Sequence, residues 1–415
     1  MKNIIKFLIV AFGTVLGTGS NFLIQVFLAN KLSVQDFGFF TSLFNIVNLL
    51  SPIIAFGITG YLLKCYSEEG VNTKKWFNSI IIFNVISVLV SFVIFNLFFL
   101  SEGNKLIILM FFLYMASISL NNFTLLRFQI SENFTNYAFW LALPNFSRLV
   151  LVTLFIEFLG ISVFGVGLLF SIASTCIIFY SFYSIFLLKE AKVFVKNTVN
   201  KKIDNDVDLK SLIKYSYPYG LASLFYLIYY QVDIVVLKYY VSYKEIAYYG
   251  VSLIFVSAVC LLPTIFYQQV CMPKIHYWAI NDKEKLEIFY KKNLIYSLLL
   301  GLFFYVIINL IISDLISFVF NDKYTDILSF FYIISIIIPL KFISQSAGAI
   351  LNINKWIKVK VYIMGGAAFL NLTINLILIK SIGLYGAIYA TLVTELFLMI
   401  CFILYLKFNF RKLYE

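Results

Sequence analysis

The chain has little charge and few of the residues that build soluble active sites. Only 13 % of its 415 residues are charged, against roughly 25 % in soluble domains. The one histidine, His276, makes a histidine-dependent triad or metal centre implausible. Five cysteines lie in or beside apolar runs, without metal-ligand spacing: Cys65, Cys176, Cys260, Cys271 and Cys401. We therefore expect no disulfide framework, no bound metal, no cofactor and no enzymatic activity.

Long polar stretches are equally scarce. Residues 189–214 form the only long run without a hydrophobic segment, and seven lysines lie in it. Long apolar blocks flank this run. They argue against interpreting it as a solvated surface loop of a soluble protein. We interpret it as a basic cytoplasmic linker between two membrane-embedded halves.

Hydrophobic residues make up 62 % of the chain and occur in continuous runs of about twenty or more. Inside a bilayer every backbone polar group must be paired within the protein, which leaves helices or a closed barrel. A barrel has weaker, alternating segments of about ten residues. The sequence therefore predicts an all-α integral membrane protein.

Twelve apolar runs are long enough to span a bilayer. The predicted spans are 4–29, 37–63, 78–100, 105–127, 138–159, 162–188, 215–240, 246–272, 293–313, 327–352, 359–380 and 384–406. With the N-terminus inside, 24 basic residues fall in cytoplasmic segments and six in outer ones. This bias predicts cytoplasmic N- and C-termini. It also explains the net charge of +12 without nucleic-acid binding.

An internal repeat supports two six-helix bundles. Residues 32–44 (LSVQDFGFFTSLF) align with 241–253 (VSYKEIAYYGVSL), and 164–171 (FGVGLLFS) align with 385–392 (YGAIYATL). Six spans per half place both repeats in the same orientation, with a central cavity between the bundles. The predicted parts are a bundle at 1–188, the linker at 189–214, a bundle at 215–406 and a cytoplasmic tail at 407–415.

Four charged residues lie in the interior of predicted spans, away from the span ends, where charge is costly and usually faces a bundle interior or a wet cavity. Arg148, Lys341 and Glu395 lie near the middle of their spans, and Asp233 lies in the outer half of its span. Two buried cations suit an anionic substrate. Asp233 and Glu395 are either counter-ions to these cations or the site of a coupling proton or cation, and the sequence leaves both readings open.

Uncharged polar residues recur every three or four positions, which places them on single helix faces. Such stripes also hold helices together, but several in one chain favour a shared aqueous cavity with donors, acceptors and flat aromatic faces for sugars. The predicted cavity-facing residues are Asn21, Gln25, Asn45, Asn48, Tyr226, Tyr230, Gln345 and Asn375. The pair of Gly13 and Gly17 favours close helix packing instead.

Four stretches resemble one known family. They are LANKLSVQDFGFFTSLFNIVNLLSPIIAFG at 28–57, QVDIVVLKYYVSYKEIAYYGV at 231–251, FVFNDKYTDIL at 318–328 and LNLTINLILIKSIGLYGAIYATLVTE at 370–395. Their order and spacing resemble Wzx-type O-antigen flippases, in the polysaccharide-transport branch of the multidrug/oligosaccharidyl-lipid/polysaccharide exporter superfamily. The resemblance covers essentially the whole chain.

The resemblance implies a flippase that moves polyprenyl-pyrophosphate-linked oligosaccharides across the bacterial cytoplasmic (inner) membrane by alternating access. It also implies that the transported oligosaccharides are the building blocks of O-antigen lipopolysaccharide, a capsule or a similar polysaccharide. Other implied partners are a polysaccharide polymerase and a chain-length regulator, and a proton or sodium gradient is a possible driving force. The placement of Arg148 and Lys341 at the pyrophosphate is our inference from charge and burial.

Three other classes compete with this interpretation. A multidrug and toxin extrusion antiporter shares the architecture, but its cavity would favour acidic residues, whereas the mid-span charges here are balanced. Peptidoglycan lipid flippases often have extra spans beyond twelve. A membrane glycosyltransferase or polymerase needs long extramembrane loops, and the outer loop near residues 313–326 is short.

Overall fold

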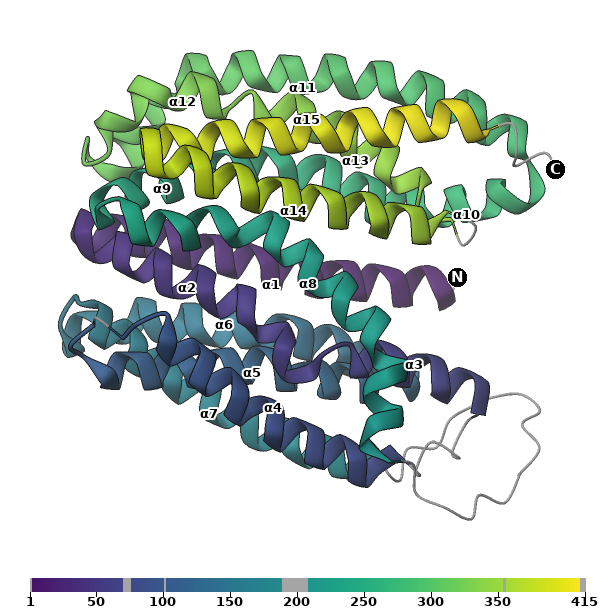
Figure 1. Ribbon diagram of the computed structural model, residues 1–415, viewed down its shortest axis with the longest axis horizontal. Helices are drawn as coiled ribbons and strands as arrows, with labels where there is room; N and C mark the ends of the chain where they lie inside the picture. The colour runs from purple at the N-terminus through teal and green to yellow at the C-terminus, as the bar shows by residue number, and fades with distance from the viewer. Residues whose placement is uncertain (1, 70–75, 101, 189–207, 354–355, 411–415) are drawn as a thin grey trace. The chain divides into compact units, whose positions relative to one another are not determined.

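The computed structural model describes residues 2–69, 76–100, 102–188, 208–353 and 356–410, and every element in these ranges is helical (Figure 1). The α-helices are α1 (Lys2–Lys31), α2 (Val34–Ala55), α3 (Ile58–Glu69), α4 (Phe77–Leu97), α5 (Lys105–Ile130), α6 (Phe134–Leu159), α7 (Val163–Leu188), α8 (Leu209–Tyr240), α9 (Tyr243–Ile265), α10 (Met272–Asn281), α11 (Lys283–Phe320), α12 (Leu328–Ile334), α13 (Ile337–Ile350), α14 (Ile357–Ile382) and α15 (Leu384–Asn409). A π-helix, Phe266–Cys271, joins α9 to α10, and a short 3-10 turn, Thr325–Ile327, precedes α12.

The described helices confirm an all-α membrane protein. Ten of them are long and apolar enough to cross a membrane, and two bent pairs raise the number to twelve. One pair is α8, bent by 51° between Phe225 and Leu227, and the other is α12 with α13, bent by 42°. Pro339 lies in the first turn of α13, where its missing N–H and its ring disfavour helix through the preceding residues. This proline explains why the predicted span 327–352 is broken.

The predicted span 37–63 is interrupted as well. Helix α2 ends at Ala55, and α3 begins at Ile58. Between them Gly57 has a φ of +72°, and a Cβ there would lie 2.2 Å from the backbone nitrogen of Gly220. Glycine is required here because the φ disfavours other residues and the close approach of α8 leaves no room for a side chain.

The chain forms two compact units. The first contains Met1–Leu32 and Leu43–Leu227, and the second contains Ser33–Ser42 and Ile228–Glu415. Most of the predicted linker, 189–207, lies outside the described residues, and the predicted bundle limits and cytoplasmic termini stay predictions.

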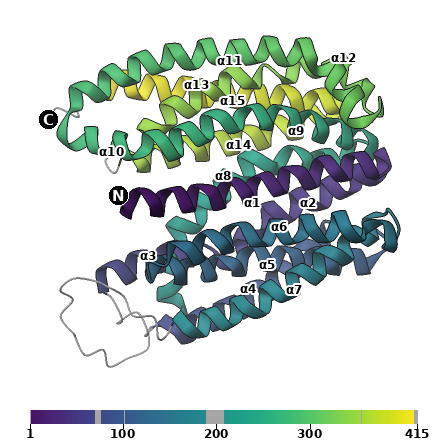
Figure 2. The ribbon, with the colours of Figure 1, turned by 180° about the vertical axis from the view of Figure 1, so that it is seen from behind.

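In the first unit α1 packs along α6, and α5 packs along α7 (Figure 2). A Cβ on Gly13 would lie 2.5 Å from the carbonyl oxygen of Ala138, and one on Gly17 would lie 2.8 Å from that of Leu141. These distances leave no space for a methyl group, so the two glycines allow the backbones of α1 and α6 to touch. The glycine pair therefore serves close helix packing, as the sequence indicated.

In the second unit α14 pairs with α15, and α13 packs on both α11 and α15. The two repeat copies have similar hydrogen bonds at their turns. Ser33 Oγ accepts from the backbone N–H of Asp36 at 3.0 Å and donates to its carboxylate at 2.7 Å. Ser242 and Glu245 form a complete capping box. In both copies the serine hydroxyl therefore caps the helix N-terminus and the acid binds that hydroxyl, and Glu245 also accepts from the backbone N–H of Ser242.

The two repeat copies also pack against each other within the second unit. A Cβ on Gly38 would lie 1.7 Å from the carbonyl oxygen of Tyr243. The rings of Phe39 and Tyr243 meet edge to face, with centroids 5.2 Å apart. Residues 33–42 are thus an integral part of the unit that the second half of the chain builds.

Candidate functional site

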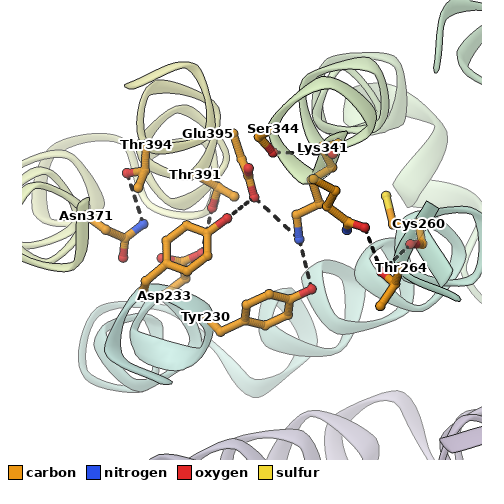
Figure 3. Close-up of polar contacts among 12 residues, drawn as sticks. Tyr230, Asp233, Cys260, Thr264, Lys341, Ser344, Asn371, Thr391, Thr394 and Glu395 are labelled. Atoms are coloured by element: carbon orange, nitrogen blue, oxygen red, sulfur yellow. Dashed lines mark hydrogen bonds and ion pairs between the residues drawn. The ribbon is translucent and has the colours of Figure 1, made fainter. Parts of the chain in front are cut away.

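Polar side chains from five helices meet inside the second unit, which α8 enters at Ile228 (Figure 3). The helices are α8, α9, α13, α14 and α15, and they contribute three of the four predicted mid-span charges. The three form two neighbouring groups, one around Asp233 and one around Lys341 with Glu395.

Asp233, on α8, is 5 % exposed and is surrounded by neutral partners. Its carboxylate accepts from Tyr249 Oη at 2.8 Å, from Thr391 Oγ1 at 2.6 Å and from Asn375 Nδ2 at 2.6 Å. In the described part of the chain no basic side chain lies within ion-pair distance of it. An ionised carboxylate buried without a cation is costly, so this group suits a bound proton or cation.

The hydrogen atoms of this group can be arranged for either charge state of Asp233. Thr391 has one hydroxyl proton and lies within hydrogen-bond distance of both Asp233 Oδ2, at 2.6 Å, and the carbonyl oxygen of Ala387, at 2.9 Å. If Asp233 is ionised, Thr391 donates to it. If Asp233 is protonated, its own O–H donates to Thr391, whose proton then turns to Ala387. The network is therefore complete with or without one extra proton.

The second group is an ion pair between α13 and α15. Lys341 Nζ lies 3.5 Å from Glu395 Oε1 and donates to Tyr230 Oη at 3.1 Å (Figure 3). The ammonium group also lies 4.3 Å from the centroid of the Tyr230 ring, a cation–π contact. Tyr229 donates a hydrogen bond to Glu395 Oε1. Glu395 is therefore ion-paired with Lys341, and its role as a counter-ion or as a coupling site stays a prediction.

The two groups share helices. Thr391 and Glu395 are four residues apart on α15, and Tyr229 and Asp233 are four residues apart on α8, so each pair lies on one helix face. Beyond them Thr264 on α9 donates to Gln345 Oε1 on α13 at 2.9 Å. A polar face of the second unit therefore runs through both groups.

A further polar network was not predicted from the sequence. Asn293 Nδ2 on α11 donates to Tyr267 Oη and to Ser346 Oγ, each at 2.8 Å. Tyr267 Oη lies 2.6 Å from Ser297 Oγ. Tyr267 belongs to the π-helix, an element that is often found at functional sites. The spacing of four between Asn293 and Ser297 was the one available sequence signal.

Arg148 lies in the first unit, on α6, and is 1 % exposed. Its Nη2 donates to Ser117 Oγ at 2.8 Å, and its Nη1 donates to Asn145 Oδ1 at 3.2 Å. The guanidinium lies 4.2 Å from the ring centroid of Tyr114. Among the described residues no carboxylate lies within ion-pair distance, and its buried Nε has no hydrogen-bond partner. This cation is held by neutral groups alone.

The predicted cavity-facing residues are in different surroundings. Asn21, Gln25, Asn45, Asn48 and Gln345 are half-buried. Tyr230 is 41 % exposed, whereas Asn375 is fully buried against Asp233. The side chain of Tyr226 lies outside the described residues. These positions do not test whether the residues contact a sugar. Their role in the cavity therefore stays a prediction.

The fold and its polar interior define a multi-pass helical membrane protein. Three solved structures with a similar fold are a flippase and two transporters. The lipid II flippase MurJ, in an inward closed conformation, matches with a TM-score of 0.72 at 17 % identity, over 99 % of this chain and 90 % of that one. An inward-facing MATE multidrug resistance transporter of the MOP superfamily matches with a TM-score of 0.63 at 14 % identity, over 98 % and 94 %. A MOP superfamily transporter from Pyrococcus furiosus, described by the reverse polarity of its binding pocket, matches with a TM-score of 0.60 at 14 % identity, over 99 % and 96 %. At these identities the likeness establishes the fold.

A family model described as polysaccharide biosynthesis protein matches residues 4–278, more than half of the chain. The chain therefore belongs to this family of polysaccharide biosynthesis proteins. None of the curated proteins matches the sequence significantly.

Proposed function

We propose that the protein is a flippase that moves polyprenyl-pyrophosphate-linked oligosaccharides from the inner to the outer leaflet of the bacterial cytoplasmic membrane. The family match and the flippase and exporter folds support this proposal. Alternating access would expose the head group to each side in turn. The products would supply an O-antigen, a capsule or a similar surface polysaccharide.

The observation that carries the proposal is the position of Lys341. Its side chain is 15 % exposed inside a membrane helix, beside the 41 % exposed Tyr230. A pyrophosphate group would meet the exposed part of the Lys341 side chain, while the exposed part of the Tyr230 ring would offer a surface to a sugar. An ammonium binds phosphate as a point charge, which tolerates the changing orientation of a transported head group.

Arg148 is proposed as the second phosphate ligand, with one added condition. Because its guanidinium is 1 % exposed and bound to Ser117 and Asn145, contact with substrate requires α5 and α6 to separate locally. The unpaired Nε would then be satisfied by a phosphate oxygen.

Asp233 is proposed as the site of the coupling ion, a proton or sodium. The hydroxyl oxygens of Thr391 and Tyr249 beside the carboxylate are hard ligands of the kind that bind such cations. Asn375 Oδ1 is buried without a partner, so an acceptor is already present beside the carboxylate. A transport assay with imposed gradients of pH or sodium distinguishes the two ions.

The decisive experiment is a lipid extraction from a host strain with this gene deleted and the upstream sugar transferases intact. Mass spectrometry quantifies the polyprenyl-pyrophosphate oligosaccharides. Accumulation of the complete repeat unit, reversed by the wild-type protein but not by Arg148→Ala or Lys341→Ala, supports the proposal and identifies the glycan. Normal flipping by both variants refutes the assignment of the two cations.

A multidrug and toxin extrusion antiporter is the second candidate function. The buried acids Asp233 and Glu395 favour it, because organic cations bind acidic sites. This function predicts an unchanged lipid pool and new sensitivity to cationic drugs in the same deletion strain.

A further inference from the structure

Lys341 already holds an anion that belongs to the protein itself. Glu395 Oε1 lies 3.5 Å from its ammonium, and the carboxylate is 1 % exposed. Glu395 Oε2 is buried and has no hydrogen-bond partner. One side of the ammonium is therefore occupied by an internal carboxylate, and another is covered by Tyr230, whose hydroxyl lies 3.1 Å from Nζ.

A phosphate that binds Lys341 must compete with this carboxylate. The ammonium carries one charge, and Tyr230 and Glu395 occupy two of its donor directions. Full ionic contact with a pyrophosphate would weaken the Lys341–Glu395 pair. Among the described residues Lys341 is the only cation within ion-pair distance of Glu395.

We propose that Glu395 is an internal competitor for the phosphate groups of the substrate at Lys341, and that its displacement is accompanied by uptake of one proton onto Glu395. This inference rests on the proposed flippase function. It adds a residue that sets the affinity for the head group and links binding of that group to a proton.

The proton is required because the carboxylate of Glu395 is buried. When its cation is displaced, water does not solvate its negative charge, so a proton must neutralise it. A buried carboxylate without a cation is strongly disfavoured. The titratable groups that face this pair are Tyr229 and Tyr230 on α8 and Cys260 on α9. Asp233 is bound to Thr391, one turn from Glu395. Lys360 on α14 donates to Gly348 and Asn352. None of these groups replaces Lys341 as the cation beside Glu395. A proton taken up from the buffered solution therefore binds the free Oε2, giving a neutral carboxylic acid that keeps its hydrogen bond from Tyr229. When the phosphate leaves, the proton leaves with it and the ion pair forms again.

The test uses the full-length protein, purified in detergent, and farnesyl pyrophosphate as the probe. Isothermal titration calorimetry in two buffers with different ionisation enthalpies gives both the affinity and the number of protons taken up. For the wild type we expect uptake of about one proton per bound probe. This measurement needs no variant and so does not depend on whether a variant folds.

Two variants separate the competitor from the binding site. Glu395→Gln should bind the probe about tenfold more tightly and lose the proton uptake, because the neutral amide releases Lys341 and does not titrate. Lys341→Met should lose binding. The matched control is Glu157→Gln, at an exposed pair where Glu157 Oε1 lies 2.6 Å from Lys31 Nζ; it should behave as the wild type.

The outcomes are distinguishable. If Lys341→Met loses binding while Glu395→Gln matches the wild type in affinity and proton count, the competitor role is wrong and the binding role of Lys341 stands. If the wild type and Glu395→Gln both fail to bind, or if Lys341→Met binds normally, the proposed head-group site fails and the competitor role fails with it.

Discussion

Removing Lys341 should affect both stability and transport, and a second substitution should separate the two effects. In Lys341→Met the carboxylate of Glu395, 1 % exposed, would lose its cation and would have to bind a proton to stay buried. Removing one partner of a buried pair costs about 3–5 kcal/mol. Because the Lys341 side chain keeps 15 % exposure and the pair is 3.5 Å long, we expect the lower end of that range, about 3 kcal/mol.

The double variant Lys341→Met, Glu395→Gln has no buried charge in this group. It should regain most of the lost free energy of unfolding, because replacing both members of a buried pair is often nearly neutral. Transport should stay absent, since the proposed phosphate ligand is still missing. Equilibrium unfolding in detergent measures the first quantity, and accumulation of lipid-linked oligosaccharide measures the second.

A control and a refuting result complete this prediction. Lys31→Met removes a lysine from the exposed Lys31–Glu157 pair, where both side chains are at least 36 % exposed, and should leave stability unchanged within error. Full transport by the double variant would show that Lys341 is not a substrate ligand. An unchanged stability of Lys341→Met would refute the energetic importance of the pair.

Three further predictions follow from single positions. Asp233→Asn should abolish the dependence of transport on an imposed ion gradient while the protein still folds, as measured in reconstituted vesicles. Arg148→Ala should lower flipping far more than the amount of protein in the membrane, as quantified by immunoblot beside the lipid analysis; equal losses would indicate a structural role. Gly13→Leu should sharply reduce the amount of folded protein, because a Cβ there would lie 2.5 Å from the carbonyl oxygen of Ala138. Gly19→Leu should be tolerated on the same helix, because nothing lies within 4 Å of its added Cβ.

Much of the fold was predictable because the bilayer restricts the alternatives. Apolar runs long enough to span it give the helices. Three predicted spans are bent or interrupted: one at the bend of α8, one at Pro339 and one at Gly57. Pro339 and Gly57 were visible in the sequence, but a proline or glycine also occurs in unbroken membrane helices. Whether each one breaks a helix depends on packing partners, such as Gly220 beside Gly57, that are distant in sequence.

The candidate site was predictable in part, for a related reason. Charge inside an apolar run singled out Asp233, Lys341 and Glu395. Their partners were harder to identify, because Tyr249, Thr391 and Asn375 belong to three different helices. Periodicity assigns a residue to a helix face but does not give the neighbour of that face. Asn375 was therefore predicted to face a cavity, whereas in the structure its amide is buried against Asp233.

The packing of residues 33–42 has a consequence for biosynthesis. These residues are made early, yet Phe37 and Phe40, each 1 % exposed, belong to the unit that otherwise begins at Ile228. Most of that unit is therefore translated long after its first segment has been inserted into the membrane. We expect that two separately produced chains, divided within 189–207, would not give a properly folded second unit unless both are present. The two copies of the repeat thus complete one core together.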